Sequence, residues 1–226
     1  MNTFDCIFNR RSVRRFKKDP VDDKLIGVML HAATHAPSAG NTQEWHFIVV
    51  KNEEKKKKLA EAALHQSFIT QAPVVIVVCA DLEKISMRYG KRGETLYAAQ
   101  DTANATMLIM LAAQALGLGS CWVGAFDEEA VGHVLELPEK FRPVAIVPIG
   151  YADEKPEKPS RVPFENLTSV DAYGKKFDIA YAVQPEAGKE IKFKPIGDHI
   201  EEVIRKGKNK QKKKLTFAEF LKILGR

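Results

Sequence analysis

The chain of 226 residues has only three cysteines and no long apolar run, and both features limit what it can be. Cys6, Cys79 and Cys121 lie far apart, which suits a reducing cytoplasm better than a disulfide framework. No apolar stretch approaches the ~20 residues that a membrane-spanning helix requires. The N-terminal residues MNTFDCIFNRR lack the apolar region of a signal peptide. We therefore expect a cytoplasmic protein.

The common motifs of metal binding and of nucleophilic catalysis are also missing from the sequence. It contains neither C-x-x-C nor H-E-x-x-H. Its six histidines are scattered along the chain, without a triad-like arrangement. We expect no metal site, and we interpret the histidines as structural residues.

The net charge of +6 is confined to one end of the chain. Residues 189–226 contain 12 Lys/Arg and 5 Asp/Glu, whereas the preceding residues contain 23 and 24. The main part of the chain is therefore close to neutral. The stretch KGKNKQKKK (206–214) could bind polyanions non-specifically. It has no interleaved aromatic residues for base stacking, so we favour a solvated linker before an apolar helix at 215–224.

Helix and strand patterns alternate along the first 151 residues, which indicates an α/β or α+β protein. The apolar, β-branched run at 72–80 is typical of a strand buried on both faces. The proline-rich stretch 154–165 should be extended. We predict helices at 2–10, 22–35, 53–65, 94–117 and 127–137, and strands at 45–50, 72–80, 120–126 and 142–151.

The stretch RRSVRRF (Arg10–Phe16) places four guanidinium groups and a hydroxyl within seven residues. Such a set binds phosphate well, because charge-assisted hydrogen bonds from arginine are stronger than neutral ones. A solvated basic turn would have the same composition. The heptapeptide alone therefore leaves a phosphate site and a surface turn as equal alternatives.

Three further segments contain residues suited to contact with a ligand. In PSAGNTQEWHF, Pro37, Gly40 and Asn41 favour a turn whose polar groups could surround a planar heterocycle. WVGAFD ends in a Gly-Ala turn that lets main chain approach a ligand, and Asp127 can cap the next helix. KPSRVPF holds Arg161 in a proline-stiffened stretch. The ordinary alternatives are a loop before a strand, a plain strand–turn–helix and a surface arginine.

Taken together, these segments resemble the FMN-dependent nitroreductase family. The shared features are, in order, R-R-S-x-R-x-F, A-P-S-x-x-N-x-Q-x-W, a long alanine-rich helix ending G-L-G, C-W-V-G-A-F-D, and P-V-A-I-V-P-I-G-Y followed by an arginine. They cover about residues 3–172 with matching order and spacing. The resemblance is specific for the family and does not specify a substrate.

The resemblance implies a set of FMN-binding residues. The positions that match are Arg10, Arg11, Ser12 and Arg14 for the phosphate and ribityl chain, Arg161 with Lys158 for the phosphate, Pro37, Ser38, Ala39 and Asn41 for the isoalloxazine ring, Gly124 and Ala125 for the turn near flavin N5, and Gln66 or Gln71 for a polar flavin contact. The flavin would carry the chemistry, so no catalytic side chain is implied.

The resemblance also implies an architecture. The expected class is α+β, with a mainly antiparallel central sheet flanked by helices, in an intertwined homodimer with FMN at the subunit interface. The helix at 94–117 would supply much of that interface. Residues 1–174 would form the FMN-binding domain, and the basic extension 175–226 would be an arm that docks on the dimer.

The implied activity is reduction of nitroaromatic, quinone or related acceptors by NAD(P)H in a ping-pong flavin cycle. The same scaffold supports dehalogenation, enone or thiazoline dehydrogenation and flavin fragmentation. A flavin-binding sensor or carrier without turnover is a further alternative, and a polyanion-binding protein is a less favoured one.

One residue departs from the family pattern. The position between the motif's glutamine and tryptophan often holds proline, and here it is Glu44. An acidic side chain there could alter substrate preference near the flavin, or could simply face solvent.

Overall fold

The computed structural model describes residues 2–175. They fall into two units, one ending at Glu157 and the other beginning at Lys158. The proposed arm at 175–226, with its helix at 215–224 and its lysine-rich stretch, lies almost wholly outside the described residues. The domain boundary near 174 and the docking role of the arm stay predictions.

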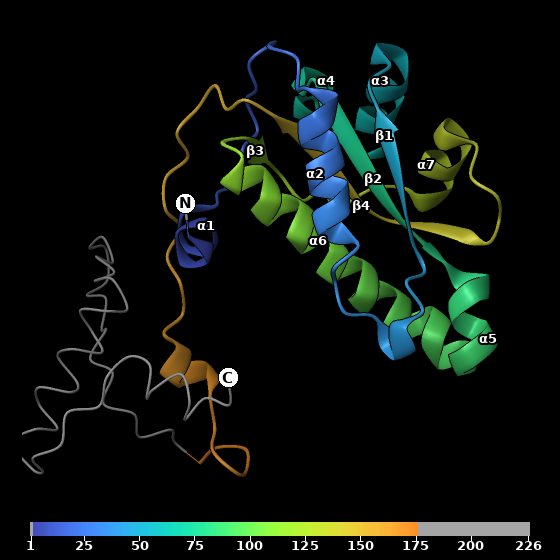
Figure 1. Ribbon diagram of the computed structural model, residues 1–226, viewed down its shortest axis with the longest axis vertical. Coiled ribbons are helices and arrows are strands. Elements are labelled where there is room, and N and C mark those ends of the chain that lie inside the picture. Colours follow the sequence, from blue (N-terminus) through green and yellow to red (C-terminus); the bar gives the residue numbers. More distant parts are fainter. Residues whose placement is uncertain (1, 176–226) are drawn as a thin grey trace, which may run out of the picture. The chain divides into compact units, whose positions relative to one another are not determined.

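The first unit is built on an antiparallel four-stranded sheet in the order β1-β2-β4-β3 (Figure 1). Its strands are β1 (Trp45–Val50), β2 (Val74–Asp81), β3 (Gly119–Ser120) and β4 (Phe141–Gly150). Each of these strands runs antiparallel to the strands beside it. The β-branched run of β2 is buried along both faces, as its composition predicted.

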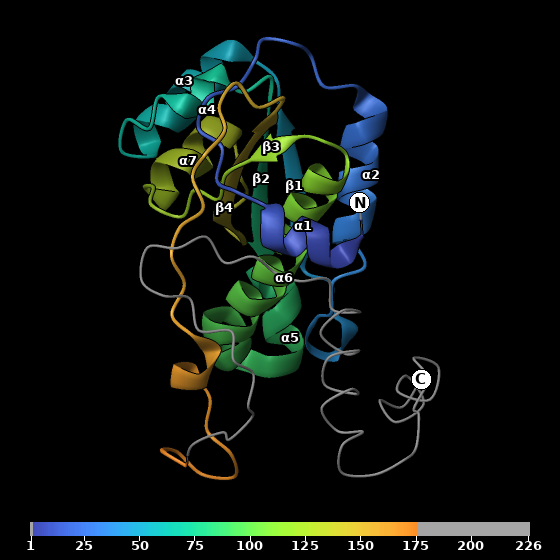
Figure 2. The same cartoon turned by 90° about the vertical axis from the view of Figure 1, so that its left-hand side faces the viewer.

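Helices cover both faces of the sheet, so the unit has three layers (Figures 1 and 2). Val74, Ile76 and Val78 of β2 pack with α2 (Asp23–Ala33) and α6 (Ala98–Ala115) on one face. The alternate residues Val75 and Val77 face the layer of α3, α4 and α7, because successive strand residues point to opposite faces. Those helices are α3 (Glu53–Ala62), α4 (Phe68–Gln71) and α7 (Glu128–Leu135). The predicted α+β class is confirmed.

Side-chain caps set the starts of several helices. Asn2 and Asp5 form a reciprocal capping box at α1 (Thr3–Asn9). Asp22 accepts a hydrogen bond from the main-chain N of Lys24 at the start of α2. Asp127 accepts from the main-chain N of Ala130 at 3.0 Å, which confirms its predicted role as the cap of α7.

Two sequence predictions for the first unit need correction. The expected strand at 120–126 is limited to the two residues of β3, after which Val123 makes only an isolated bridge to Ile146. The chain turns away there, and Gly124 and Ala125 are exposed. Helix α5 (Leu82–Arg92) was also not predicted, although Leu82, Ile85 and Tyr89 recur at helical spacing. A π-helical turn, Gly93–Tyr97, joins α5 to the predicted long helix.

The described part of the second unit contains one short 3-10 helix, Phe164–Leu167. The stretch before it has no helix or strand, as its prolines predicted. Among the residues that the structure describes, no helix has the length and apolar character needed to cross a membrane.

Candidate functional site

The arginine segment is fixed against the edge strand of the sheet. Ser12 forms a parallel bridge with Ser120 of β3, and the main-chain N of Val13 donates to the Ser120 carbonyl at 3.0 Å. Val13 is buried and packs with the layer of α3 and α7. These contacts leave the flanking arginines half-buried or exposed. The main chain thereby presents the guanidinium groups beside β3.

The guanidinium groups of this segment have different surroundings. The Arg14 guanidinium lies 5.8 Å from the ring centroid of Phe68 in α4. Burial raises the pKa of the Cys121 thiol, and the charges of Arg14 and Arg10 oppose that shift. Arg11 donates through one nitrogen to the carbonyls of Phe8 and Arg10, at 2.9 and 2.8 Å. This bond caps α1 and orients the Arg11 side chain.

Glu154 is a residue of this region that the sequence analysis missed. Its carboxylate accepts from the main-chain N of Arg14 and, at 3.1 Å, from that of Arg15. Arg15 also donates to the Asp153 carbonyl at 3.1 Å. Glu154 therefore holds the main chain of the arginine segment in place. No local pattern could have indicated this, because the partners are about 140 residues apart.

The turn after β3 lies next to Gln66. The Gln66 side-chain amide donates to the carbonyls of Ala63 and Ala125, at 2.9 and 3.2 Å. Gln71, the other candidate for a polar flavin contact, is exposed in α4. The geometry therefore favours Gln66 at this turn. The arginine half-site is defined below as Arg10, Arg11, Ser12 and Arg14 with Gln66 and Gly124–Ala125.

The loop at 37–43 has a strained main chain and exposed polar groups. Asn41 and Gln43 adopt left-handed conformations with φ of 58° and 49°, and Gly40 has φ of 54°. A Cβ atom on Gly40 would lie 2.3 Å from the Tyr89 hydroxyl, so glycine is required there. The Ser38 hydroxyl accepts from the main-chain N of Gln43 at 3.0 Å. Such non-glycine left-handed residues cluster at functional sites.

Two cations of α5 hold this loop from outside. Arg88 donates to the Gly40 carbonyl at 2.8 Å, and Lys84 donates to the Gln43 carbonyl at 3.0 Å. Neither residue was predicted to contact the loop, because α5 was not predicted from the sequence. Their hydrogen bonds support a main-chain conformation that the loop sequence alone would not maintain. Residues 37–43 are called the loop half-site below.

Two alternatives were expected for Glu44: exposure to solvent, or an effect on substrate preference. The first is wrong. Glu44 is only 1% exposed. Its Oε2 lies 2.8 Å from the Thr42 hydroxyl, and Asp101 of α6 lies within hydrogen-bonding reach of its carboxyl group. Asp101 in turn accepts from the main-chain N of Ala39 at 2.7 Å. Glu44 therefore lies beneath the loop half-site.

The two half-sites lie at opposite ends of the sheet (Figure 1). The loop half-site leads into β1 beside Asp81, whose main-chain N donates to the Glu44 carbonyl at 2.7 Å. The arginine half-site adjoins Ser120, which pairs with Ile149, the partner of Val74. Val74 and Asp81 are the two ends of β2, so the half-sites of one chain are about 20 Å apart.

Lys158 and Arg161 belong to the second unit. Arg161 is exposed and donates to the Ser160 carbonyl at 3.2 Å. The assignment of both residues to the phosphate stays a prediction.

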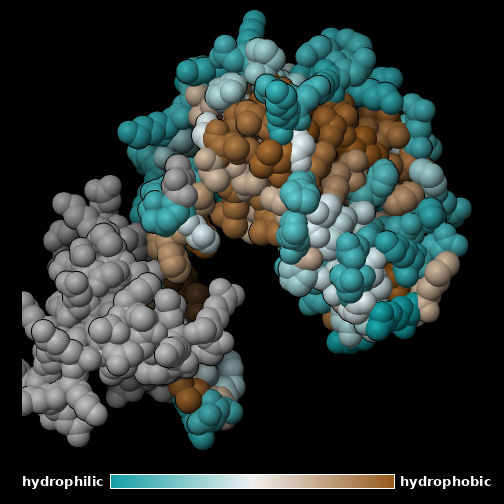
Figure 3. Space-filling model, viewed as in Figure 1, coloured by the Kyte–Doolittle hydropathy of each residue, from teal (hydrophilic) through white to brown (hydrophobic). Residues whose placement is uncertain are grey.

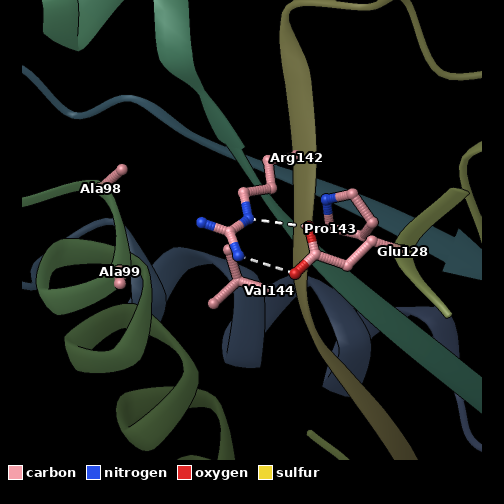
Figure 4. A pocket seen from close by; sticks show the side chains of 6 residues that line it. All are labelled: Ala98, Ala99, Glu128, Arg142, Pro143 and Val144. Atoms are coloured by element: carbon pink, nitrogen blue, oxygen red, sulfur yellow. Dashed lines mark hydrogen bonds and ion pairs between the residues drawn. The ribbon is translucent and has the colours of Figure 1, made fainter. Parts of the chain in front are cut away.

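A small cavity is lined by residues that belong to neither half-site (Figure 4). It measures about 90 Å³, and the bidentate pair of Arg142 with Glu128, at 2.7 and 2.8 Å, crosses it. Its other lining residues are Ala98, Ala99, Pro143 and Val144. Sites for small organic ligands are usually about 300–1,000 Å³, so this cavity is too small for a flavin.

The buried thiols give no sign of covalent chemistry. Cys79 lies inside the sheet, where burial raises its pKa to about 12. Burial also raises the pKa of Cys121. A thiol with a raised pKa is a poor nucleophile. Within residues 2–175, no cluster of three or more His, Cys, Asp or Glu residues could hold a metal ion.

The fold is α+β, and the arginine half-site lies along one edge of its sheet. The model of the "Nitroreductase family" matches residues 7–67 and 62–151, and the chain belongs to this family. It is 35% identical over 185 residues to an NADH dehydrogenase of Thermus thermophilus, covering 70% of this chain and 90% of that protein.

Two further comparisons involve proteins whose names include FMN. An FMN reductase [NAD(P)H] of Bacillus subtilis is 29% identical over 190 residues, covering 78% of this chain and 76% of that protein. An FMN-dependent nitroreductase of Clostridium difficile superposes with a TM-score of 0.61 at 30% identity, covering 70% of this chain and 91% of that one. The sequence-based family assignment is confirmed.

Proposed function

We propose that this nitroreductase-family oxidoreductase, which uses FMN and NAD(P)H, reduces nitroaromatic, quinone or related small acceptors in the cytoplasm by a ping-pong cycle. The observation that carries this proposal is the arginine segment, whose main chain is held by β3 and Glu154 at one end of the sheet. The FMN-named relatives support the same cofactor.

The residues present fit FMN. The arginine half-site offers guanidinium groups and a hydroxyl, which suit a phosphate dianion. The exposed main chain of Gly124 and Ala125 allows a ring to approach closely. Once bound, FMN supplies hydride and electron transfer. Arg10, Arg11 and Arg14 would hold its phosphate, and Ser12 would bind the phosphate or ribityl chain.

Completion of the site requires a second copy of the chain. One FMN cannot contact two half-sites about 20 Å apart along β2. In a homodimer, the loop half-site of one protomer can meet the arginine half-site of its partner. Figure 3 shows apolar side chains gathered on the face of α2 and α6, where Val28 is 50% and Met107 is 41% exposed. Such a contiguous apolar face suits a subunit interface.

The visible absorption spectrum of the purified full chain tests this function. Flavin bands should be present and should bleach on anaerobic addition of NADH or NADPH, then return when a nitroaromatic or quinone is added. A reduced flavin that neither acceptor reoxidises would reject the proposed acceptor class. A colourless protein that FMN cannot reconstitute would refute the function altogether.

Arg161 should contribute to FMN affinity. Arg161→Ala is expected to raise the Kd for FMN about tenfold or more, because a hydrogen bond to a charged group contributes about 1.5–3 kcal/mol. Fluorescence titration of the apoprotein with FMN measures this. Lys155→Ala removes an exposed cation from the same proline-rich stretch of sequence and should leave the Kd unchanged. If both variants bound FMN as tightly as the wild type, Arg161 would not be part of the FMN site.

A further inference from the structure

The region beneath the loop half-site contains more oxygen contacts than it has hydrogens. The single hydrogen of the Thr42 hydroxyl is shared between the Ala39 carbonyl and Glu44 Oε2, each at 2.8 Å, and is not available to other contacts. Glu44 and Asp101 also lie within hydrogen-bonding reach of one another. Two ionised carboxylates could supply no hydrogen for that contact.

The burial of these groups makes a missing hydrogen costly. Glu44 is 1% exposed and Asp101 is 6% exposed. Glu44 Oε1 has no hydrogen-bond donor within the described residues. An unpaired buried charge is strongly unfavourable, and two carboxylates that share a site cannot readily both ionise.

We propose that Glu44 is protonated at neutral pH, donates its proton from Oε1 to Asp101, and thereby makes Asp101 a positioning residue for the flavin-binding loop. Asp101 passes this restraint to the loop by accepting from the main-chain N of Ala39 at 2.7 Å. The proton is placed on Glu44 because Asp101 Oδ2 already accepts that N–H. The role in flavin binding rests on the proposed function.

The other charged groups near the loop do not neutralise this pair. Lys84 and Arg88 of α5 are bonded to the carbonyls of Gln43 and Gly40. Asp81, at the end of β2, pairs with Lys140 at 3.1 Å. Burial, with the Asp101 charge as a smaller cause, raises the pKa of Glu44. A proton, rather than a cation, therefore balances the two carboxyl groups.

The sign of the pH effect follows from the raised pKa of Glu44. Below the ordinary carboxyl pKa, Glu44 is protonated in both the folded and the unfolded chain. As pH rises, the unfolded chain loses the proton first, so this contribution to stability declines and is lost above the raised pKa. A second charge then appears beside Asp101, and the loop should be displaced from its flavin-binding conformation.

Infrared spectroscopy and FMN titration of the full chain test the proposal. At neutral pH the wild-type protein should show the carbonyl stretch of a protonated carboxyl group, and Glu44→Gln should lack it. As the pH is raised from acidic to alkaline, the wild-type Kd for FMN should rise, because Glu44 ionises beside Asp101 and the loop loses its restraint. Glu44→Gln should show no such rise, because its amide still donates but does not titrate.

Glu139→Gln, a carboxyl-to-amide change at an exposed position, is the matched control and should behave as the wild type. Absence of the protonated band in the wild type, or an equal alkaline rise in Glu44→Gln, would overturn the proposal. Because the infrared band is measured on the wild type without flavin, it decides the proton assignment even if Glu44→Gln does not fold. Failure of the wild type to bind FMN at any pH would reject the proposed function instead.

Discussion

Replacing Arg10 and Arg11 together by Ala should yield a protein that purifies without flavin. Each removes a guanidinium from the arginine half-site, and a charge-assisted hydrogen bond contributes about 1.5–3 kcal/mol. The combined loss predicts a Kd for FMN raised by about 10² to 10⁴. Flavin absorbance per subunit after purification, followed by titration with FMN, measures the effect.

Arg15→Ala is the matched control for that double variant. Arg15 lies in the same segment, but its side chain is exposed and bonded to the Asp153 carbonyl. We expect it to retain flavin. Urea denaturation should accompany the comparison, because Arg11 also caps the end of α1. A double variant that remains fully loaded with FMN would show that these arginines do not hold the phosphate.

Gly119→Ala should damage both the fold and the arginine half-site. A Cβ atom at this position of β3 would lie 2.8–3.0 Å from three side-chain atoms of Val13. The β-branched side chain of Val13 cannot rotate away easily, so the segment that carries Ser12 must move. Overpacking of this kind typically costs about 1–3 kcal/mol. We expect a lower free energy of unfolding in urea and weaker FMN binding.

Gly132→Ala makes the same chemical change, but it is expected to raise the free energy of unfolding. A Cβ atom at this position of α7 meets nothing within 4 Å, and alanine stabilises a helix relative to glycine by about 0.5–1 kcal/mol. This variant should unfold at a higher urea concentration with unchanged FMN affinity. If Gly119→Ala were as stable as the wild type, the close packing of β3 on Val13 would not constrain the site.

The predicted strands and helices were most accurate where buried apolar residues follow one another in a regular pattern along the sequence. The run of Val and Ile in β2 defined a strand buried on both faces, and WHFIVV matched β1 residue for residue. The segment after Cys121 was mispredicted as a strand because its apolar residues are buried by packing and not by regular pairing. Helix α5 was missed because its few apolar residues are separated by charged residues, most of which are exposed in the structure.

The sequence by itself determined the family and the class of fold, and it supplied the residues proposed to bind FMN, since these depend on local motifs in a fixed order. Only the tertiary structure showed that the arginine segment and the loop lie at opposite ends of β2, because that separation depends on strand register. It also placed Glu154 under Arg14, and Asp101 beside Glu44. The members of each pair come from distant parts of the chain, so no local sequence pattern indicates them.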